Sequence, residues 1–175
     1  MSKLQLVTYP ASVLRRQASA VENVDGELIK MADEMFEIMY ENAGIGLAAP
    51  QVGLSNQVLV IDVRQDDLPT YVLINPRVIK REGEVEAEEG CLSLPEIFGE
   101  VKRAERVQVR YVDQNGEEQT LEAEGLLARA IQHEMDHLNG VLFIDRLGET
   151  RRRLLDQQIR ALAESSDGKT REDGR

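Results

Sequence analysis

The two histidines of the chain are four residues apart, in the pentapeptide His133–His137, which has the pattern HExxH. The surrounding sequence, from 125 to 139, has helical spacing of apolar residues: Leu127, Ile131 and Leu138. Residues four apart lie on one face of a helix, close enough for two imidazoles to bind the same metal ion. The apolar residues indicate that the helix packs on a core, where inward-facing imidazoles need partners. The chain must therefore fold around this helix and bring at least one further ligand to it.

The remaining sequence predicts a mixture of helices and strands. We expect a helix from about Asp25 to Gly44, strands at 57–63 and 71–75, a hairpin of 107–112 with 119–124, and a last helix at about 150–163. Gly140 is placed as the C-terminal cap of the HExxH helix. Strands with hairpin pairing, followed by helices, favour an α+β fold. The predicted architecture has antiparallel or mixed sheets packed around a central HExxH-bearing helix, with a C-terminal helix.

The length of 175 residues suits one domain. We expect a single catalytic domain over residues 1–164. The segment 165–175 contains no large apolar residue, so it is predicted to be a disordered tail.

The charge balance excludes some partners. The chain has 32 acidic and 21 basic residues, and its net charge of -11 repels a phosphate backbone, so general nucleic-acid binding is not expected. No apolar run approaches the ~20 residues of a membrane span. The opening MSKLQLVTYP lacks the apolar core of a secretory signal. We therefore expect no membrane association and a cytoplasmic protein.

The single cysteine, Cys91, is the leading candidate for a third metal ligand. A catalytic metal site commonly has three protein ligands and one open position. A lone cysteine is otherwise a small buried apolar residue. Two other readings remain open: an HExxH zinc endopeptidase whose third ligand is Glu149 or Glu164, and a structural metal site closed by a fourth protein ligand.

Three motifs resemble the signature motifs of peptide deformylases and occur in the same order. They are GIGLAAPQ at 44–51, EGCLS at 89–93 and QHEMDH at 132–137, and the similarity extends from about Leu4 to Leu147. The resemblance implies that Cys91, His133 and His137 bind the metal. It also implies that Glu134 is the catalytic general acid/base.

The same resemblance implies an activity and a substrate. The expected reaction removes the N-formyl group from the N-terminal methionine of newly synthesised polypeptides and releases formate, with a metal-bound water as nucleophile. The side-chain amide of Gln51 and the backbone N–H of Leu92 are expected to stabilise the developing negative charge. Backbone groups of Ile45, Gly46 and Gly90 are expected to hold the peptide. The methionine pocket is expected to be lined by Ile45, Leu126 and Ala130.

The cofactor is expected to be one divalent metal per chain. Thiolate and imidazole ligands suit Fe²⁺, Zn²⁺, Ni²⁺ or Co²⁺, and the family resemblance favours Fe²⁺, with the others as replacements. A basic segment near the C-terminus suggests docking on the ribosome, although a solvated helix face explains the same charges. Its residues are Arg146, Arg151, Arg152, Arg153 and Arg160.

Overall fold

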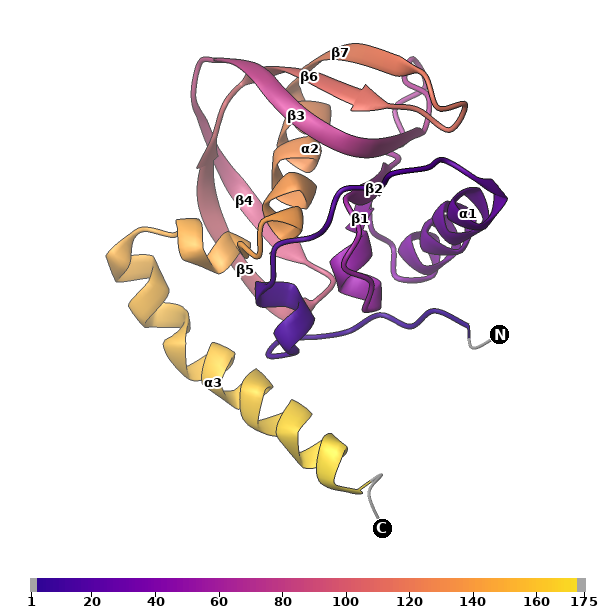
Figure 1. The fold of residues 1–175 in the computed structure, drawn as a ribbon. Coiled ribbons are helices and arrows are strands. Elements are labelled where there is room, and N and C mark those ends of the chain that lie inside the picture. Colours follow the sequence, from indigo (N-terminus) through magenta and orange to yellow (C-terminus); the bar gives the residue numbers. More distant parts are fainter. Residues whose placement is uncertain (1–2, 173–175) are drawn as a thin grey trace.

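The computed structural model describes residues 3–172, with side chains as far as 166. The chain forms an α+β fold with a five-stranded sheet, a two-stranded sheet and three α-helices (Figure 1). In the described residues, every pair of neighbouring strands is antiparallel. Of the two predicted alternatives, antiparallel or mixed sheets, the structure therefore has antiparallel ones. Within the described residues, none of the helices is long and apolar enough to cross a membrane.

The larger sheet has the strand order β1-β2-β3-β6-β7. Its strands are β1 (Gly46–Ala48), β2 (Val58–Ile61), β3 (Tyr71–Glu82), β6 (Arg106–Val112) and β7 (Glu118–Glu124). The predicted hairpin is confirmed as β6 and β7. Strand β3 runs seven residues past the predicted end at Asn75, to Glu82. Most side chains in that extension are exposed, and its two adjacent aliphatic residues, Val78 and Ile79, do not continue an alternating apolar pattern. Pairing with β6 keeps the backbone extended there.

The smaller sheet is a hairpin of β4 (Val85–Cys91) and β5 (Leu94–Arg103), and the sequence analysis did not predict it. Four of the seven residues of β4 are exposed and three are glutamates, which hides the strand from a search for apolar alternation. Strand β5 alternates between buried and exposed positions. Two residues, Leu92 and Ser93, connect the strands. The hairpin thus delivers Cys91 at the end of β4.

The first helix, α1 (Gly26–Glu41), begins where predicted, since the side chain of Asp25 accepts a hydrogen bond from the backbone N–H of Leu28 at 2.9 Å. Its other end differs from the expectation. The left-handed residue is Ala43, with φ of 55°, and not Gly44. The N–H of Gly44 instead donates to the carbonyl of Met39 at 2.9 Å, which completes the C-terminal turn.

Helix α2 (Gly125–Leu138) carries the HExxH pattern and ends at Gly140 as predicted, with φ of 71°. The N–H of Val141 donates to the carbonyl of Asp136 at 2.9 Å, and that of Gly140 to His137 at 3.2 Å. These two bonds form a Schellman motif. Ten of the 14 residues of α2 are buried, so more than one face of the helix is covered. It packs against β1, β2, β6 and β7.

The last helix, α3 (Glu149–Glu172), is longer than the predicted 150–163. Helix α3 thus includes the first part of the segment for which the sequence predicts a disordered tail, from residue 165, while 173–175 lie outside the described residues. The sequence there has few apolar residues, but Glu, Lys and Arg are good helix formers. The hydroxyl of Ser166 also donates to the carbonyl of Tyr9 at 3.1 Å. Three short 3₁₀ helices complete the fold: η1 (Ser12–Arg15), η2 (Ala49–Val52) and η3 (Phe143–Arg146).

Candidate metal site

Three side chains that could hold a metal ion converge from two elements. Cys91 ends β4, and His133 and His137 lie on α2; one donor atom from each lies within 4.8 Å of the other two. The Sγ of Cys91 is 3.3 Å from Nε2 of His137. A tetrahedral ion with bonds of about 2.3 Å to sulfur and 2.0–2.1 Å to nitrogen sets these atoms about 3.5 Å apart. The residues therefore fit a metal that takes thiolate and imidazole ligands.

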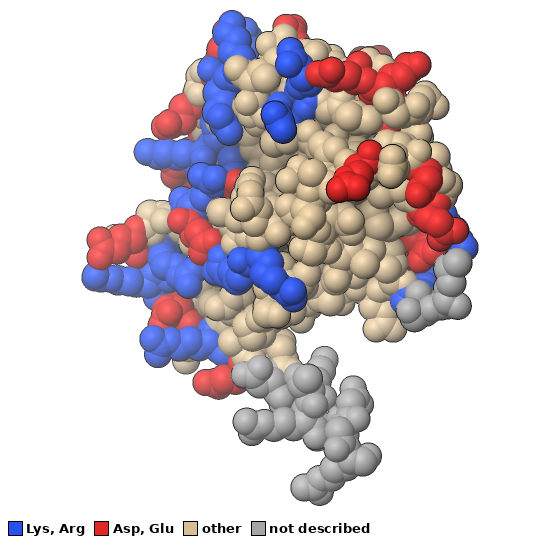
Figure 2. Space-filling model, viewed as in Figure 1, with Lys and Arg blue, Asp and Glu red and all other residues tan. Residues whose placement is uncertain are grey.

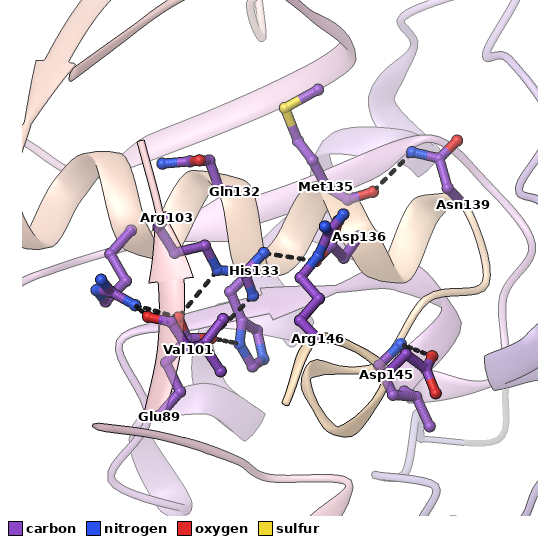
Figure 3. Close-up of polar contacts among 12 residues, drawn as sticks. Glu89, Val101, Arg103, Gln132, His133, Met135, Asp136, Asn139, Asp145 and Arg146 are labelled. Carbon is purple, nitrogen blue, oxygen red and sulfur yellow. Dashed lines mark hydrogen bonds and ion pairs between the residues drawn. The ribbon is translucent and has the colours of Figure 1, made fainter. Parts of the chain in front are cut away.

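Glu89 orients the ring of His133 by contacting its Nδ1 atom. The Nδ1 of His133 lies 2.8 Å from Oε1 of Glu89, which leaves Nε2 as the nitrogen that could bind a metal ion (Figure 3). Burial raises the pKa of Glu89, but hydrogen bonds from Arg103 and His133 outweigh it and hold that pKa well below its ordinary range. Glu89 is therefore a carboxylate, and the Nδ1–H of His133 donates to it.

Glu134 has the environment of an acid/base group. Its side chain is buried, and its Oε2 has no hydrogen-bond partner among the described residues. Burial is the main cause that raises the pKa of Glu134, to about 7. A carboxyl group of that pKa exchanges a proton readily near neutral pH. The protein thus leaves the hydrogen-bonding capacity of this buried oxygen unused.

The amide of Gln51 is held in one orientation. Its Oε1 accepts a hydrogen bond from the backbone N–H of Ala48 at 2.9 Å. Its Nε2 is consequently directed towards Ser93 Oγ at 3.3 Å and Cys91 Sγ at 3.5 Å. Leu92 lies in the turn immediately after Cys91. Both predicted donors thus come from segments that adjoin the cysteine.

A cavity of about 470 Å³ opens beside these groups. It is lined by Asn42, Ala43, Gly44, Ile45, Gly46, Gln51, Gly90, Cys91, Leu92, Pro95, Glu96, Phe98, Ala130, His133 and Glu134. Four of the five predicted substrate-binding residues belong to this lining. The fifth, Leu126, is 42% exposed and lies outside it. A larger cavity, of about 630 Å³, involves Lys80 and Arg106 and contains none of the metal-binding residues.

The sequence analysis missed a buried charge network beside the histidines. Arg103 donates to both oxygens of Glu89 at 2.9 Å and to Asp136 at 2.6 Å. Arg146 donates to both oxygens of Asp136 (Figure 3). Glu89 and Asp136 lie inside the quoted motifs, which was the available signal. Arg103 and Arg146 lie outside them, and only the fold brings them in.

The position of Cys91 also bears on the competing readings. An endopeptidase would need Glu149 or Glu164 as its third ligand. Glu149 instead lies on α3 and pairs with Arg153. Among the described residues, Cys91 completes the group with the histidines. The structure therefore favours Cys91 as the third ligand.

The chain is similar to known proteins over most of its length. The model of the family "Polypeptide deformylase" matches residues 3–153. A peptide deformylase of Nitrosococcus oceani is 49% identical over 164 residues, which cover 94% of this chain and 96% of the relative. The crystal structure of a peptide deformylase from Legionella pneumophila is 38% identical, with a TM-score of 0.86, and the match covers 95% of this chain and 98% of that one. A Synechococcus elongatus peptide deformylase in complex with actinonin is 43% identical, with a TM-score of 0.82 and coverage of 94% and 88%.

Proposed function

The chain belongs to the polypeptide deformylase family, and we propose that it removes the formyl group from the N-terminal methionine of newly synthesised polypeptides. The reaction adds water across the formyl amide and gives formate and a free amine. The observation that carries the proposal is the meeting of Cys91, His133 and His137 beside the unpartnered oxygen of Glu134. We assign the activity to a single catalytic domain, residues 1–164, in which sheets surround the HExxH helix α2.

In this proposal, Glu134 transfers a proton from the attacking water to the departing amine. Cys91, His133 and His137 would hold a divalent metal, and the chemistry it would supply there is a lowered pKa, towards about 7, for the water molecule that acts as nucleophile. Glu134 accepts a proton from that water as it attacks the formyl carbon. The same carboxyl group then donates the proton to the departing amine nitrogen when the C–N bond breaks. The raised pKa of Glu134, about 7, suits both directions of transfer.

Negative charge develops on the former formyl oxygen during the attack. We assign its stabilisation to Nε2 of Gln51 and the backbone N–H of Leu92. The bond from Ala48 to the Oε1 of Gln51 fixes which end of the amide faces the site, so this donor needs no reorganisation during the reaction.

The peptide is proposed to bind along Ile45, Gly46 and Gly90 through main-chain hydrogen bonds, which tolerate varied side chains. Ile45 and Ala130 supply apolar surface for the methionine side chain. Leu126 lies outside the lining of the cavity, and we propose that its exposed side chain contributes to the outer edge of the methionine pocket.

The metal is proposed to be Fe²⁺, with Zn²⁺, Ni²⁺ or Co²⁺ as replacements. The donor set suits all four ions, and membership of the deformylase family favours iron. A ferrous site with a thiolate ligand is sensitive to oxygen. We expect the iron form to lose activity in air, and full activity after long aeration with iron retained would contradict the assignment.

The proposed place of action is the cytoplasm, at the ribosome. Figure 2 shows basic side chains interspersed with acidic ones over the region of α3. Four of the predicted docking arginines have protein partners: Arg146 donates to Asp136, Arg152 to the carbonyl of Ile144, Arg153 to Glu149, and Arg160 pairs with Asp156. Docking therefore rests on Arg151 and on exchange of the exposed pairs. Salt-sensitive cosedimentation with ribosomes supports it, and its absence rejects it.

The central test is formate release from a formyl-methionyl peptide by anaerobically purified protein with its metal quantified. Glu134→Gln should retain the metal and lose at least about 100-fold in kcat. Glu88→Gln is a matched control, since that glutamate is exposed on β4, and it should behave like the wild type. A fully metallated wild type that releases no formate overturns the proposal.

A further inference from the structure

The proposed metal site joins two parts of the fold that pack on different neighbours. Helix α2, with both histidines, packs against β1, β2, β6 and β7. The hairpin of β4 and β5, with Cys91, packs against η3, and β5 also contacts α3. The distance between the cysteine and the histidines depends on how the hairpin sits on α2. Long charged side chains make the polar links between these two parts.

Arg129 on α2 is the side chain that contacts both strands of the hairpin. Its Nη1 donates to the carbonyl of Val101 on β5 at 2.9 Å, and its Nη2 donates to the carbonyl of Val85 on β4 at 2.7 Å. Its Nη1 also lies 2.6 Å from Oε2 of Glu89. The side chain is 12% exposed, and its bonds to Val101 and Glu89 are partly buried, while its bond to Val85 lies at the surface. A planar guanidinium can hold several acceptors in fixed directions at once.

The Glu89 carboxylate is the acceptor shared by all these groups. Its Oε1 bonds to His133 and Arg103, and its Oε2 bonds to Arg103 and Arg129. Arg103 lies on β5, which belongs to the same hairpin as Glu89. Without Arg129, every hydrogen bond from an arginine to the Glu89 carboxylate would therefore come from within the hairpin. Arg129 adds a support from the helix that carries the metal-binding histidine.

We propose that Arg129 is a positioning residue for the metal site. It fixes the hairpin on α2 and holds Glu89 in the orientation that aligns the ring of His133. It touches neither the substrate nor the metal. The inference rests on the metal site of the proposed function, and it assigns the retention of the metal to a residue one helical turn before His133.

The test measures how fast bound Zn²⁺ passes to an excess of a chromogenic chelator, together with the free energy of unfolding of the metal-free protein. Arg129→Met keeps the apolar stem and removes every donor. It should release zinc about 10-fold faster than the wild type, as expected for loss of a group that supports a metal-binding histidine. Arg129→Lys keeps one charged donor and should fall between the two. Arg106→Met removes an exposed arginine paired with Glu124 and should release zinc at the wild-type rate.

The outcomes separate the alternatives. If Arg129→Met is less stable when metal-free but releases zinc within 2-fold of the wild-type rate, which is about 0.4 kcal/mol in barrier height, the arginine is only structural and the inference is overturned. If Arg106→Met accelerates release as much as Arg129→Met does, the effect is one of net charge and the inference is also overturned. A wild-type protein that binds no zinc, iron, nickel or cobalt rejects the proposed function instead.

Discussion

Gly46 lies directly against Glu134. A Cβ atom built on Gly46 would be 2.9 Å from both Cγ and Oε1 of the glutamate, closer than real Cβ contacts allow. The strand β1 therefore leaves room for the proposed acid/base group by having no side chain at this position. The backbone of Gly46 has no need of the left-handed region, so the close approach alone explains the glycine.

Gly46→Ala should lower kcat, because the added methyl group displaces the Glu134 carboxyl group from its position. A misplacement of about 1 Å at a reacting group can cost on the order of 100-fold in rate. The metal content should stay at the wild-type level, since the three atoms nearest to the added Cβ all belong to Glu134 and not to a proposed ligand. Steady-state kinetics with metal analysis would check this, and wild-type kcat in the variant would contradict it.

Cys91→Ala should lose the metal on dialysis. Removal of a direct ligand weakens binding by more than the 10- to 100-fold expected for supporting groups. Elemental analysis after exhaustive dialysis measures the loss, and adding excess Zn²⁺ to the variant tests whether it is reversible. A variant that keeps one metal per chain would show that the third ligand lies elsewhere, as the endopeptidase reading requires.

Exchanging alanine and glycine at the C-terminal ends of α1 and α2 should change the free energy of unfolding in opposite directions. Ala43 has φ of 55° and Gly140 has φ of 71°. A left-handed backbone costs roughly 1–2 kcal/mol for a residue with a Cβ atom. Ala43→Gly should therefore stabilise the protein, by up to about 1 kcal/mol after the entropy of glycine is subtracted.

Gly140→Ala should destabilise by more than that backbone cost. The new Cβ atom would also lie 2.6 Å from the carbonyl oxygen of Arg15, which belongs to the backbone and cannot move aside cheaply. Urea unfolding of the metal-free proteins gives both values. Equal effects of the same sign would contradict the assignment of the left-handed positions.

Asp145 should make stability depend on pH. Burial raises its pKa, but hydrogen bonds from Arg15 and from the backbone N–H of Leu142 outweigh burial, so the folded-state pKa of Asp145 lies below the ordinary 3.8. A depressed pKa contributes stability above the unfolded-state value, and this stability disappears as the pH falls through the folded-state pKa. Because both side chains of the pair are about one-third exposed, the contribution should stay below about 1 kcal/mol.

The measurement compares the wild type with Asp145→Asn by urea unfolding without metal. The wild type should be the more stable protein at pH 6.5, and the two should converge as the pH falls below about 3.8. A difference that stays constant over this range would show that the ionisation of Asp145 is not its cause.

The sequence predicted the structure best in segments where candidate site residues lie within a clear apolar pattern. The helix α2 could be predicted because its apolar spacing, its two histidines and its terminal glycine all lie within one short segment. The hairpin β4–β5 could not, because β4 has few apolar residues and three glutamates, and its backbone is held extended by pairing with β5. Local apolar pattern therefore identifies core elements and misses an exposed strand.

The site was predictable as far as its residues lie inside the motifs. Cys91 and the two histidines meet as expected. The positions of Arg103 and Arg129 were not foreseen, because a lone arginine on a strand or helix reads as a solvated residue. Their burial follows from carboxylates that are distant in sequence, such as Glu89, which lies 40 residues from Arg129.

Cys91 lies on the β4–β5 hairpin and His137 lies on helix α2. The two residues are 46 positions apart, so an ion bound to both is a removable crosslink between segments that otherwise meet through side chains. An ion that binds only the folded chain raises the melting temperature as its free concentration increases. Two batches of identical sequence but different metal content should therefore melt at different temperatures, and a melting curve can serve as an assay of metal occupancy before any substrate is added.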